Sequence, residues 1–149
     1  MPVYLSNATR KTGIDFSAVE RTVDALLLAL NEDGSSVSIS FVRDPAIREL
    51  NKSFRGKDAS TDVLSFPMVE DGDEFAGAER LLGDIVISVD TAKRQAGDYY
   101  ASLAREVERL LIHGMLHLLG HDHMEPGERA RMEAEERRLA DRIGMPWPY

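Results

Sequence analysis

The sequence of 149 residues predicts an α+β fold in which helices flank a small mixed β-sheet. Stretches with the apolar repeat of amphipathic helices occur along the whole chain, and shorter stretches between them have the pattern of strands. These stretches do not follow a strict order of strand, helix and strand, which favours an α+β arrangement. No internal repeat and no linker rich in proline, glycine or serine divides the chain, so we expect one domain over residues 1–149.

The first predicted element is an amphipathic helix. Ser17 followed by Glu20 has the pattern of a capping box, which marks the start of a helix. Apolar residues then recur at helical spacing until Asp33 and Gly34 break the pattern. These apolar residues are Val19, Val23, Leu26, Leu27 and Leu30.

A strand and a short helix follow. Residues 37–41 alternate apolar side chains with serine, which indicates a half-buried strand. Asp44 and Pro45 then supply an N-cap and a first-turn proline for a helix that runs to about Phe54. We expect residues 55–61 to form a polar loop.

The rest of the chain predicts two more strands and three helices. The strands cover residues 62–68 and 84–89, and an acidic loop separates them. The helices begin near Thr91, at Ser102 and at Pro126, and the last two end near Gly120 and Gly144.

Composition restricts the function. The chain has 18 Lys and Arg against 26 Asp and Glu, and this net charge of -8 argues against broad nonspecific binding to polyanions. Because it has no cysteine, a metal site must use imidazole and carboxylate ligands. The sequence shows neither a signal peptide nor an apolar run long enough to span a bilayer, so we expect a cytoplasmic protein without a membrane partner.

All four histidines lie between His113 and His123. His113 and His117 project from one helix face, at the spacing at which two imidazoles can share a metal ion. Gly120 can adopt the left-handed conformation that ends a helix and turns the chain, so that His123 returns toward the same point. Three neutral imidazoles leave the fourth position of a tetrahedral zinc ion open to water, which is typical of a catalytic site. The sequence therefore predicts one metal ion per chain on these three histidines. We expect Zn²⁺, although imidazole also suits nickel, copper and iron.

The pattern H-x-x-x-H-x-x-G-x-x-H has the spacing of metzincin proteases, with one difference. Metzincins carry glutamate beside the first histidine as general base, and here that position is Gly114. Because glycine cannot accept a proton, a metalloprotease is the weakest hypothesis. A phosphodiester substrate fits better, since zinc can polarise a phosphoryl oxygen or supply hydroxide and an arginine can neutralise the developing charge.

A local basic segment offers such an arginine. Residues 42–57 hold five basic and two acidic side chains, net +3, whereas residues 58–90 hold one basic and nine acidic side chains, net -8. Arg55 offers a fork of donors suited to a phosphate, and Lys57 can assist as a point charge. The alternative for Arg55 is a solvated arginine at a helix end that pairs with an acidic neighbour.

Four segments together resemble the YbeY-type bacterial endoribonucleases, which are metal-dependent rRNA maturation factors. The similarity spans about residues 37–125. The segments are NKSFRGKD at 51–58, TDVLSFP at 61–67, LGDIVIS at 82–88 and HGMLHLLGHDH at 113–123.

The resemblance implies a mixed sheet flanked by helices, with a metzincin-like helix and turn that hold zinc on His113, His117 and His123. It also implies that Arg55 is a catalytic residue that faces the metal. The implied function is a zinc-dependent endoribonuclease, specific for single strands, that acts in 16S rRNA 3′-end maturation and ribosome quality control. RNA of the small ribosomal subunit is then the main partner, and ribosomal proteins or an assembly GTPase are further candidates.

One position departs from the family pattern, because His121 stands where tyrosine is common. We expect His121 to be exposed or to face substrate rather than to bind the metal. Asp122 adjoins a ligand and is a candidate acceptor for a ligand ring or for a proton, or alternatively a turn former. Thr61 and Asp62 either cap the entry to a strand or reach toward the metal side, and we favour the structural role. Glu106 and Glu108 lie on the histidine helix, where no spacing selects either as a base, so we expect solvated helix charges.

A second function class stays open beside the endoribonuclease. The protein could be a ribosome-assembly factor that binds RNA or a ribosomal protein and uses zinc mainly for folding. The missing glutamate at Gly114 supports this alternative.

Overall fold

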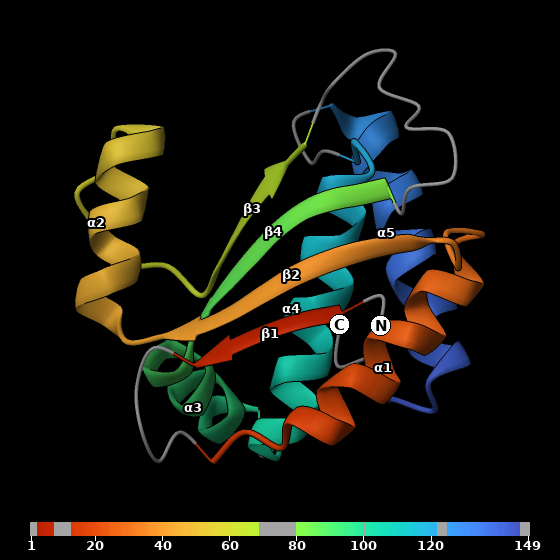
Figure 1. Ribbon diagram of the computed structural model, residues 1–149, viewed down its shortest axis with the longest axis horizontal. Coiled ribbons are helices and arrows are strands. Elements are labelled where there is room, and N and C mark those ends of the chain that lie inside the picture. The colour runs from red at the N-terminus through yellow and green to blue at the C-terminus, as the bar shows by residue number, and fades with distance from the viewer. Residues whose placement is uncertain (1–2, 8–12, 69–79, 100, 122–124, 147–149) are drawn as a thin grey trace.

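The protein is described from a computed structural model, which covers residues 3–7, 13–68, 80–99, 101–121 and 125–146. In these ranges the chain forms four strands and five helices (Figure 1). The strands are β1 (Val3–Asn7), β2 (Ser35–Val42), β3 (Val63–Pro67) and β4 (Arg80–Ser88). The helices are α1 (Phe16–Ala29), α2 (Asp44–Arg55), α3 (Val89–Asp98), α4 (Leu103–Leu118) and α5 (Pro126–Arg142).

The strands form one mixed sheet in the order β1-β2-β4-β3. The pairs β1–β2 and β2–β4 are parallel, and β3 pairs with β4 in the antiparallel direction. This arrangement confirms the predicted α+β class with a small mixed sheet. Strand β1 was not expected from the sequence, and it is held by its pairing with β2, with Val3 opposite Val37 and Asn7 opposite Phe41.

The two faces of the sheet are covered unequally. Helices α1, α4 and α5 lie on one face and build the main core with the apolar side chains of β2 and β4 (Figure 1). Helix α2 covers the other face at the β3 end, where a second, smaller cluster forms. That cluster consists of Val42, Ile47, Leu64 and Val86, with Leu50 and Phe66 packed against it. The α4 and α2 layers therefore meet opposite faces of edge strand β3.

The pleat of β3 decides which of its residues meets which helix. Successive side chains of a strand point to opposite faces. Leu64 and Phe66 pack in the α2 cluster. Val63 packs against the main core, and the Ser65 hydroxyl donates a hydrogen bond of 3.1 Å to a carbonyl of α4.

Two helix starts differ from the prediction. The first helix begins at Phe16 rather than after Ser17, because extended Asp15 is the N-cap and its Oδ1 accepts from the Ala18 amide at 3.2 Å. The N-cap of α2 is Arg43, so the prediction that Asp44 caps this helix was wrong. Asp44 stands inside the first turn, and its carboxylate binds side chains of β4 and α3: Ser88, Thr91 and Arg94.

The third helix also begins earlier than expected. Ser88 ends β4 and caps α3, since its Oγ accepts from the Thr91 amide at 3.2 Å, so Val89 belongs to the helix rather than to the strand. The predicted cap at Ser102 and the predicted start at Pro126 are both confirmed. The acidic loop predicted between the last two strands falls on residues 69–79, outside the described part. No helix in the described ranges is long and apolar enough to cross a membrane.

Candidate metal centre

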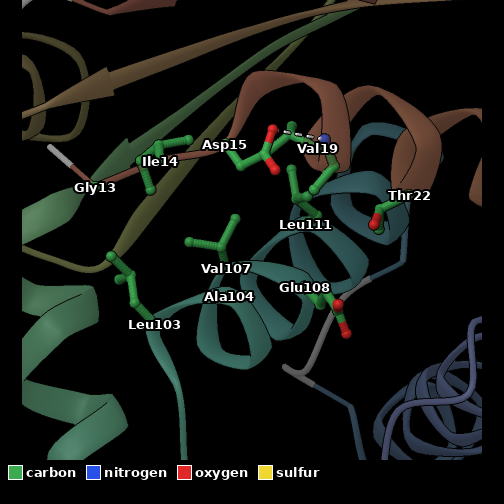
Figure 2. A pocket seen from close by; sticks show the side chains of 11 residues that line it. Gly13, Ile14, Asp15, Val19, Thr22, Leu103, Ala104, Val107, Glu108 and Leu111 are labelled. Atoms are coloured by element: carbon green, nitrogen blue, oxygen red, sulfur yellow. Dashed lines mark hydrogen bonds between the residues drawn. The ribbon is translucent and has the colours of Figure 1, made fainter.

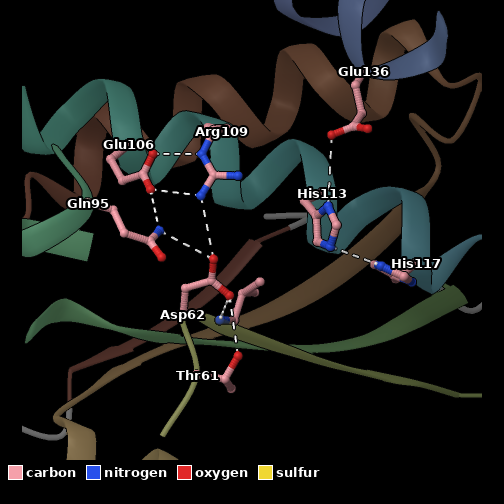
Figure 3. Close-up of polar contacts among 9 residues, drawn as sticks. Thr61, Asp62, Gln95, Glu106, Arg109, His113, His117 and Glu136 are labelled. Carbon is pink, nitrogen blue, oxygen red and sulfur yellow. Dashed lines mark hydrogen bonds and ion pairs between the residues drawn. The ribbon is translucent and has the colours of Figure 1, made fainter. Parts of the chain in front are cut away.

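His113 and His117 lie side by side on the last two turns of α4 (Figure 3). Their Nε2 atoms are 3.0 Å apart, and the ring centroids are separated by 4.5 Å. Two imidazoles that bind one tetrahedral zinc ion at ordinary bond lengths have nitrogens roughly 3.3 Å apart. Both rings are half-buried, so they are fixed by the helix and remain open on one side. The pair therefore fits the chemistry of two ligands to one metal ion.

The helix that carries the pair approaches the sheet closely at Gly114. The Gly114 carbonyl accepts the hydrogen bond from Ser65 of β3. A Cβ atom at this position would lie 3.0 Å from Ile85 Cγ2 and 3.2 Å from Ser65 Oγ. Position 114 thus faces the sheet, and a glutamate side chain there would collide with β3 and β4. The general base that metzincins carry beside the first histidine has no room in this fold.

Glu136 of α5 approaches the other nitrogen of His113 (Figure 3). Its Oε2 lies 3.8 Å from His113 Nδ1, and the side chain is 8% exposed. A carboxylate on the far nitrogen of a metal-binding histidine orients the ring and makes it a stronger ligand. Sequence reasoning missed this residue. The sequence did carry a signal for it, because Glu136 recurs at helical spacing with the apolar residues Met132 and Leu139. The structure shows all three residues buried.

A buried ion pair lies about one to two turns before His113 on α4. Glu106 is 3% exposed, and its two oxygens accept from Arg109 Nε at 2.7 Å and from Arg109 Nη2 at 2.8 Å. Gln95 of α3 adds a hydrogen bond of 2.6 Å to Glu106 Oε2. The expectation that Glu106 is a solvated helix charge was wrong, because partners from its own helix and from α3 satisfy its carboxylate inside the protein.

Asp62 connects this ion pair to the start of β3 (Figure 3). Its Oδ1 accepts from the Val63 amide at 2.8 Å, and its Oδ2 lies 3.3 Å from Gln95 Nε2 and 3.5 Å from Arg109 Nη2. Thr61 lies within 3.4 Å of the same carboxylate. These contacts agree with the structural roles expected for both residues at the strand entry.

Glu108 lies on a different side of α4. It is half-buried and pairs with Arg105 at 3.0 Å, so it is not merely solvated. It lines a mainly apolar hollow between α4 and the start of α1, together with Leu103, Val107 and Val19 (Figure 2). The helical repeat turns Glu108 about 140° away from His113, and Leu103 lies almost three turns before His113 along the helix. The hollow is therefore separate from the candidate metal centre.

Arg55 and Lys57 lie on the α2 side of β3. Arg55 is the last residue of α2 rather than part of the following loop, and both side chains are exposed. Neither makes a side-chain hydrogen bond or ion pair with a residue in the described ranges. Since α2 and α4 pack on opposite faces of β3, Arg55 and the histidines belong to opposite sides of one edge strand. That Arg55 faces the metal stays a prediction.

The chain after α4 turns as the sequence indicated. Gly120 has φ +91°, and the amide of His121 donates to the Leu116 carbonyl at 3.0 Å. His121 is half-buried and borders a hollow with Glu128 and Arg131 of α5. The predicted ligand His123 and its neighbour Asp122 lie outside the described residues. Within the described ranges, no group of three or more His, Cys, Asp or Glu side chains is arranged to hold a metal ion.

The family model described as "Endoribonuclease YbeY" matches residues 4–144 of the chain. The chain belongs to the YbeY family. Two curated YbeY relatives, both named "Endoribonuclease YbeY", match most of it. The one from Moorella thermoacetica is 48% identical over 135 residues, 87% of this chain and 86% of the relative. The one from Pelotomaculum thermopropionicum is 43% identical over 151 residues, 97% of this chain and 99% of the relative.

A solved structure supports the same fold. The solution structure of a protein from Thermotoga maritima superposes with a TM-score of 0.65, at 24% sequence identity, over 95% of this chain and 88% of that one. The YbeY match covers all five described helices. It therefore includes the histidine pair, the buried ion pair and the basic end of α2.

Proposed function

We propose that this protein is a zinc-dependent endoribonuclease that cuts single-stranded RNA. The observation that carries the proposal is the convergence of the His113 and His117 Nε2 atoms, 3.0 Å apart, in a member of the YbeY family. Its substrate is 16S rRNA, cut at the 3′ end during maturation and quality control of the small ribosomal subunit. The cleavage takes place in the cytoplasm, and ribosomal proteins or an assembly GTPase are the proposed protein partners.

His113, His117 and His123 are the proposed metal ligands, with one ion per chain. Imidazole suits zinc, and the chain offers no thiolate that would compete. When bound, zinc supplies Lewis-acid stabilisation of a phosphoryl oxygen and an acidic water. Glu136, close to Nδ1 of His113, favours the tautomer that leaves Nε2 free to bind.

The protein's own side chains bind and neutralise the phosphodiester. Arg55 presents two parallel N–H donors to phosphate oxygens, and its charge stabilises the negative charge that develops during cleavage. Lys57 adds a second positive charge, and His121 is proposed to face the substrate rather than to bind the metal. Asp122 is the proposed proton acceptor, or it accepts a hydrogen bond from the neighbouring ligand ring.

The chemical ends of the products identify the attacking oxygen. A 2′,3′-cyclic phosphate requires attack by the 2′-hydroxyl of the RNA, whereas a linear phosphate end on an RNA that lacks this hydroxyl requires water. Mass spectrometry of the fragments distinguishes the two routes.

A non-catalytic ribosome-assembly factor with a structural zinc ion is the second candidate function. The contact of Gly114 with the sheet favours it, because the fold leaves no place for a base beside the first ligand. Complementation of a deletion strain with Arg55→Ala separates the two. A binding role survives the loss of one of several phosphate contacts that leaves the metal in place, whereas a catalytic role does not survive the loss of its arginine.

Cleavage of single-stranded RNA by the zinc-loaded protein tests the proposed function directly. We expect His113→Ala and Arg55→Ala to abolish cleavage or reduce it at least a hundredfold, in line with the loss of a catalytic group. Lys93→Ala removes an exposed cation from α3 and is the matched control, with wild-type activity. Equal cleavage by wild type and by both site variants would rule the proposal out.

A further inference from the structure

We propose that Phe54 is a base-stacking platform for single-stranded RNA, on the side of β3 opposite the histidine pair. This inference rests on the proposed function, because it assigns a contact to the same RNA substrate. It concerns a residue that the metal and Arg55 chemistry does not use.

Phe54 ends the sheet-facing stripe of α2. The stripe begins at Ile47, which is fully buried, and continues through Leu50 and Asn51 to Phe54, which is 68% exposed. Among the described residues no other large apolar side chain is more exposed. Helix α2 therefore carries an aromatic ring past the edge of the core into solvent.

The exposed ring is held in place from one side. Phe66 of β3 packs against Phe54 in an edge-to-face contact, with centroids 5.3 Å apart and the planes at 65°. Phe66 is itself half-buried in the small cluster under α2. This contact fixes the Phe54 ring and leaves most of its surface for a partner. An aromatic side chain presented in this way can stack a nucleobase of any sequence.

The surroundings of Phe54 are cationic. Lys52, Arg55 and Lys57 follow one another around the end of α2, and all three are exposed. None of these three side chains makes a hydrogen bond or ion pair with a residue in the described part of the chain. The nearby carboxylate of Asp58 is already paired with Arg48, at 2.8 Å. The local charge therefore favours an anionic partner over an apolar one, and the exposed ring suits an anion that carries nucleobases.

The turn after α2 fixes these cations relative to the ring. The Lys57 amide donates to the Asn51 carbonyl at 3.3 Å. The buried Asn51 side chain donates from Nδ2 to the Ala59 carbonyl at 2.9 Å. Because the backbone holds the turn, ligand binding has to order only the ends of the cationic side chains, which lowers its entropic cost.

Strand β3 connects this platform to the metal centre. Ser65 contacts α4 at Gly114, the neighbour of His113, and the next residue, Phe66, supports Phe54 on the other face. Strand β3 is at the edge of the sheet, with a neighbour on one side only. A single RNA strand that crosses this edge can place a phosphate near the histidines and a base on Phe54. Double-stranded RNA, whose bases are already stacked, cannot use the platform, so the platform favours the single strands of the proposed function.

Binding of a fluorescein-labelled, ten-nucleotide 2′-O-methyl oligouridylate, measured by anisotropy, tests the platform. We expect Phe54→Leu, which keeps an apolar side chain but has no π-face, to bind about tenfold more weakly than wild type. Phe54→Trp should bind at least as tightly as wild type. Leu28→Ala, which truncates an equally exposed apolar side chain on α1, is the matched control and should not change the affinity. Thermal unfolding of each variant checks that the fold is kept.

An abasic chain of the same length separates stacking from charge. Wild type and Phe54→Leu should bind this ribose-phosphate chain equally. Ultraviolet crosslinking of oligouridylate, followed by mass spectrometry, should join uridine to Phe54 in wild type, and this measurement does not require the RNA to stay intact. Equal affinity of wild type and Phe54→Leu for oligouridylate would overturn the platform. The platform is also overturned if Phe54→Leu weakens binding of the abasic chain as much as it weakens binding of oligouridylate.

The platform and the proposed nuclease activity can fail separately. If the protein binds oligouridylate through Phe54 but does not cut RNA in the presence of zinc, the platform is supported and the nuclease activity is rejected. If the protein cuts RNA but Phe54→Leu binds oligouridylate as tightly as wild type, the nuclease activity is supported and the platform is rejected.

Discussion

Glu136 is a buried residue of α5 that approaches the candidate metal centre. Its carboxylate is 3.8 Å from His113 Nδ1, and a carboxylate in this position typically raises the metal affinity of the ring 10- to 100-fold. We expect Glu136→Gln to weaken zinc binding by roughly that factor, because the amide keeps the shape but loses the charge. Competition with a chelator of known affinity measures the change. Glu133→Gln, an exposed change on the same helix, should leave the affinity unaltered.

Packing of α4 against the sheet requires a glycine at position 114, which is also the position where metzincins carry their general base. A methyl group here would lie 3.0 and 3.1 Å from Ile85 atoms and 3.2 Å from Ser65 Oγ. Overpacking of this kind costs about 1–3 kcal/mol, and the better helix propensity of alanine offsets up to about 1 kcal/mol. We therefore expect Gly114→Ala to lower the free energy of unfolding in urea.

Gly97 provides the matched comparison for Gly114. It lies in α3, and a Cβ atom there would meet nothing within 4 Å. Gly97→Ala should raise the free energy of unfolding by up to about 1 kcal/mol. If both substitutions changed stability in the same direction, close approach of α4 to the sheet would not explain the glycine at 114.

At the scale of elements, the buried ion pair of Glu106 and Arg109 joins α4 to α3 and β3. Removing one partner of a buried pair leaves an uncompensated charge and costs about 3–5 kcal/mol. We expect Glu106→Ala to destabilise the protein by roughly this amount in urea unfolding. Glu108→Ala on the same helix removes a more exposed pair with Arg105 and should cost at most about 1 kcal/mol. Equal effects of the two substitutions would contradict a structural role for the network.

A second set of polar contacts fastens α2 to α3. Burial raises the pKa of the Asp44 carboxyl, but hydrogen bonds from Ser88, Thr91 and Arg94 more than compensate, so the pKa lies below its ordinary value. The Asp44 amide donates to Asp90, and this bond lowers the pKa of Asp90, with Arg43 adding to the effect.

These depressed pKa values predict acid sensitivity. A carboxyl whose pKa is lower in the folded protein stabilises it above the pKa of the unfolded chain, near 3.8. That stabilisation is lost as the pH falls through the lowered values. We expect the urea midpoint of wild type to drop more steeply below about pH 4 than that of Asp44→Asn, which starts from a lower midpoint at pH 7. Asp24→Asn, an exposed change on α1, should follow wild type at every pH.

The elements with a strong local pattern were predictable, and those that depend on distant partners were not. The i, i+4 spacing alone indicated that His113 and His117 share a face, and the capping serine and proline fixed the starts of α4 and α5. Strand β1 has only five residues, so its pattern is weak and its pairing with β2 decides its structure. Glu106 was expected to be a solvated helix charge, because the sequence does not show that Gln95 of α3 joins its ion pair with Arg109. Glu136 was missed because its neighbour His113 lies on another helix.

At the scale of the whole molecule, the distribution of charge matters more than its total. The chain carries a net charge of -8, yet Lys52, Arg55 and Lys57 form one exposed basic group at the end of α2. An RNA strand held by this group releases counterions from about three phosphates. For single strands, the slope of log affinity against log salt concentration is about -0.7 per neutralised phosphate. We therefore expect a slope near -2 for the oligouridylate, much shallower than for a strongly basic RNA-binding protein.

Substitution of single cations tests this origin of the affinity. Lys57→Ala should make the slope less steep by roughly 0.7, because one phosphate contact is lost, and should weaken binding to all single-stranded sequences alike. Lys93→Ala removes the same charge from α3 and should leave the slope unchanged, although it lowers the net charge equally. Titrations at four or more salt concentrations give the slopes. If both substitutions shift the slope by the same amount, RNA is attracted by the overall field of the protein rather than by the end of α2.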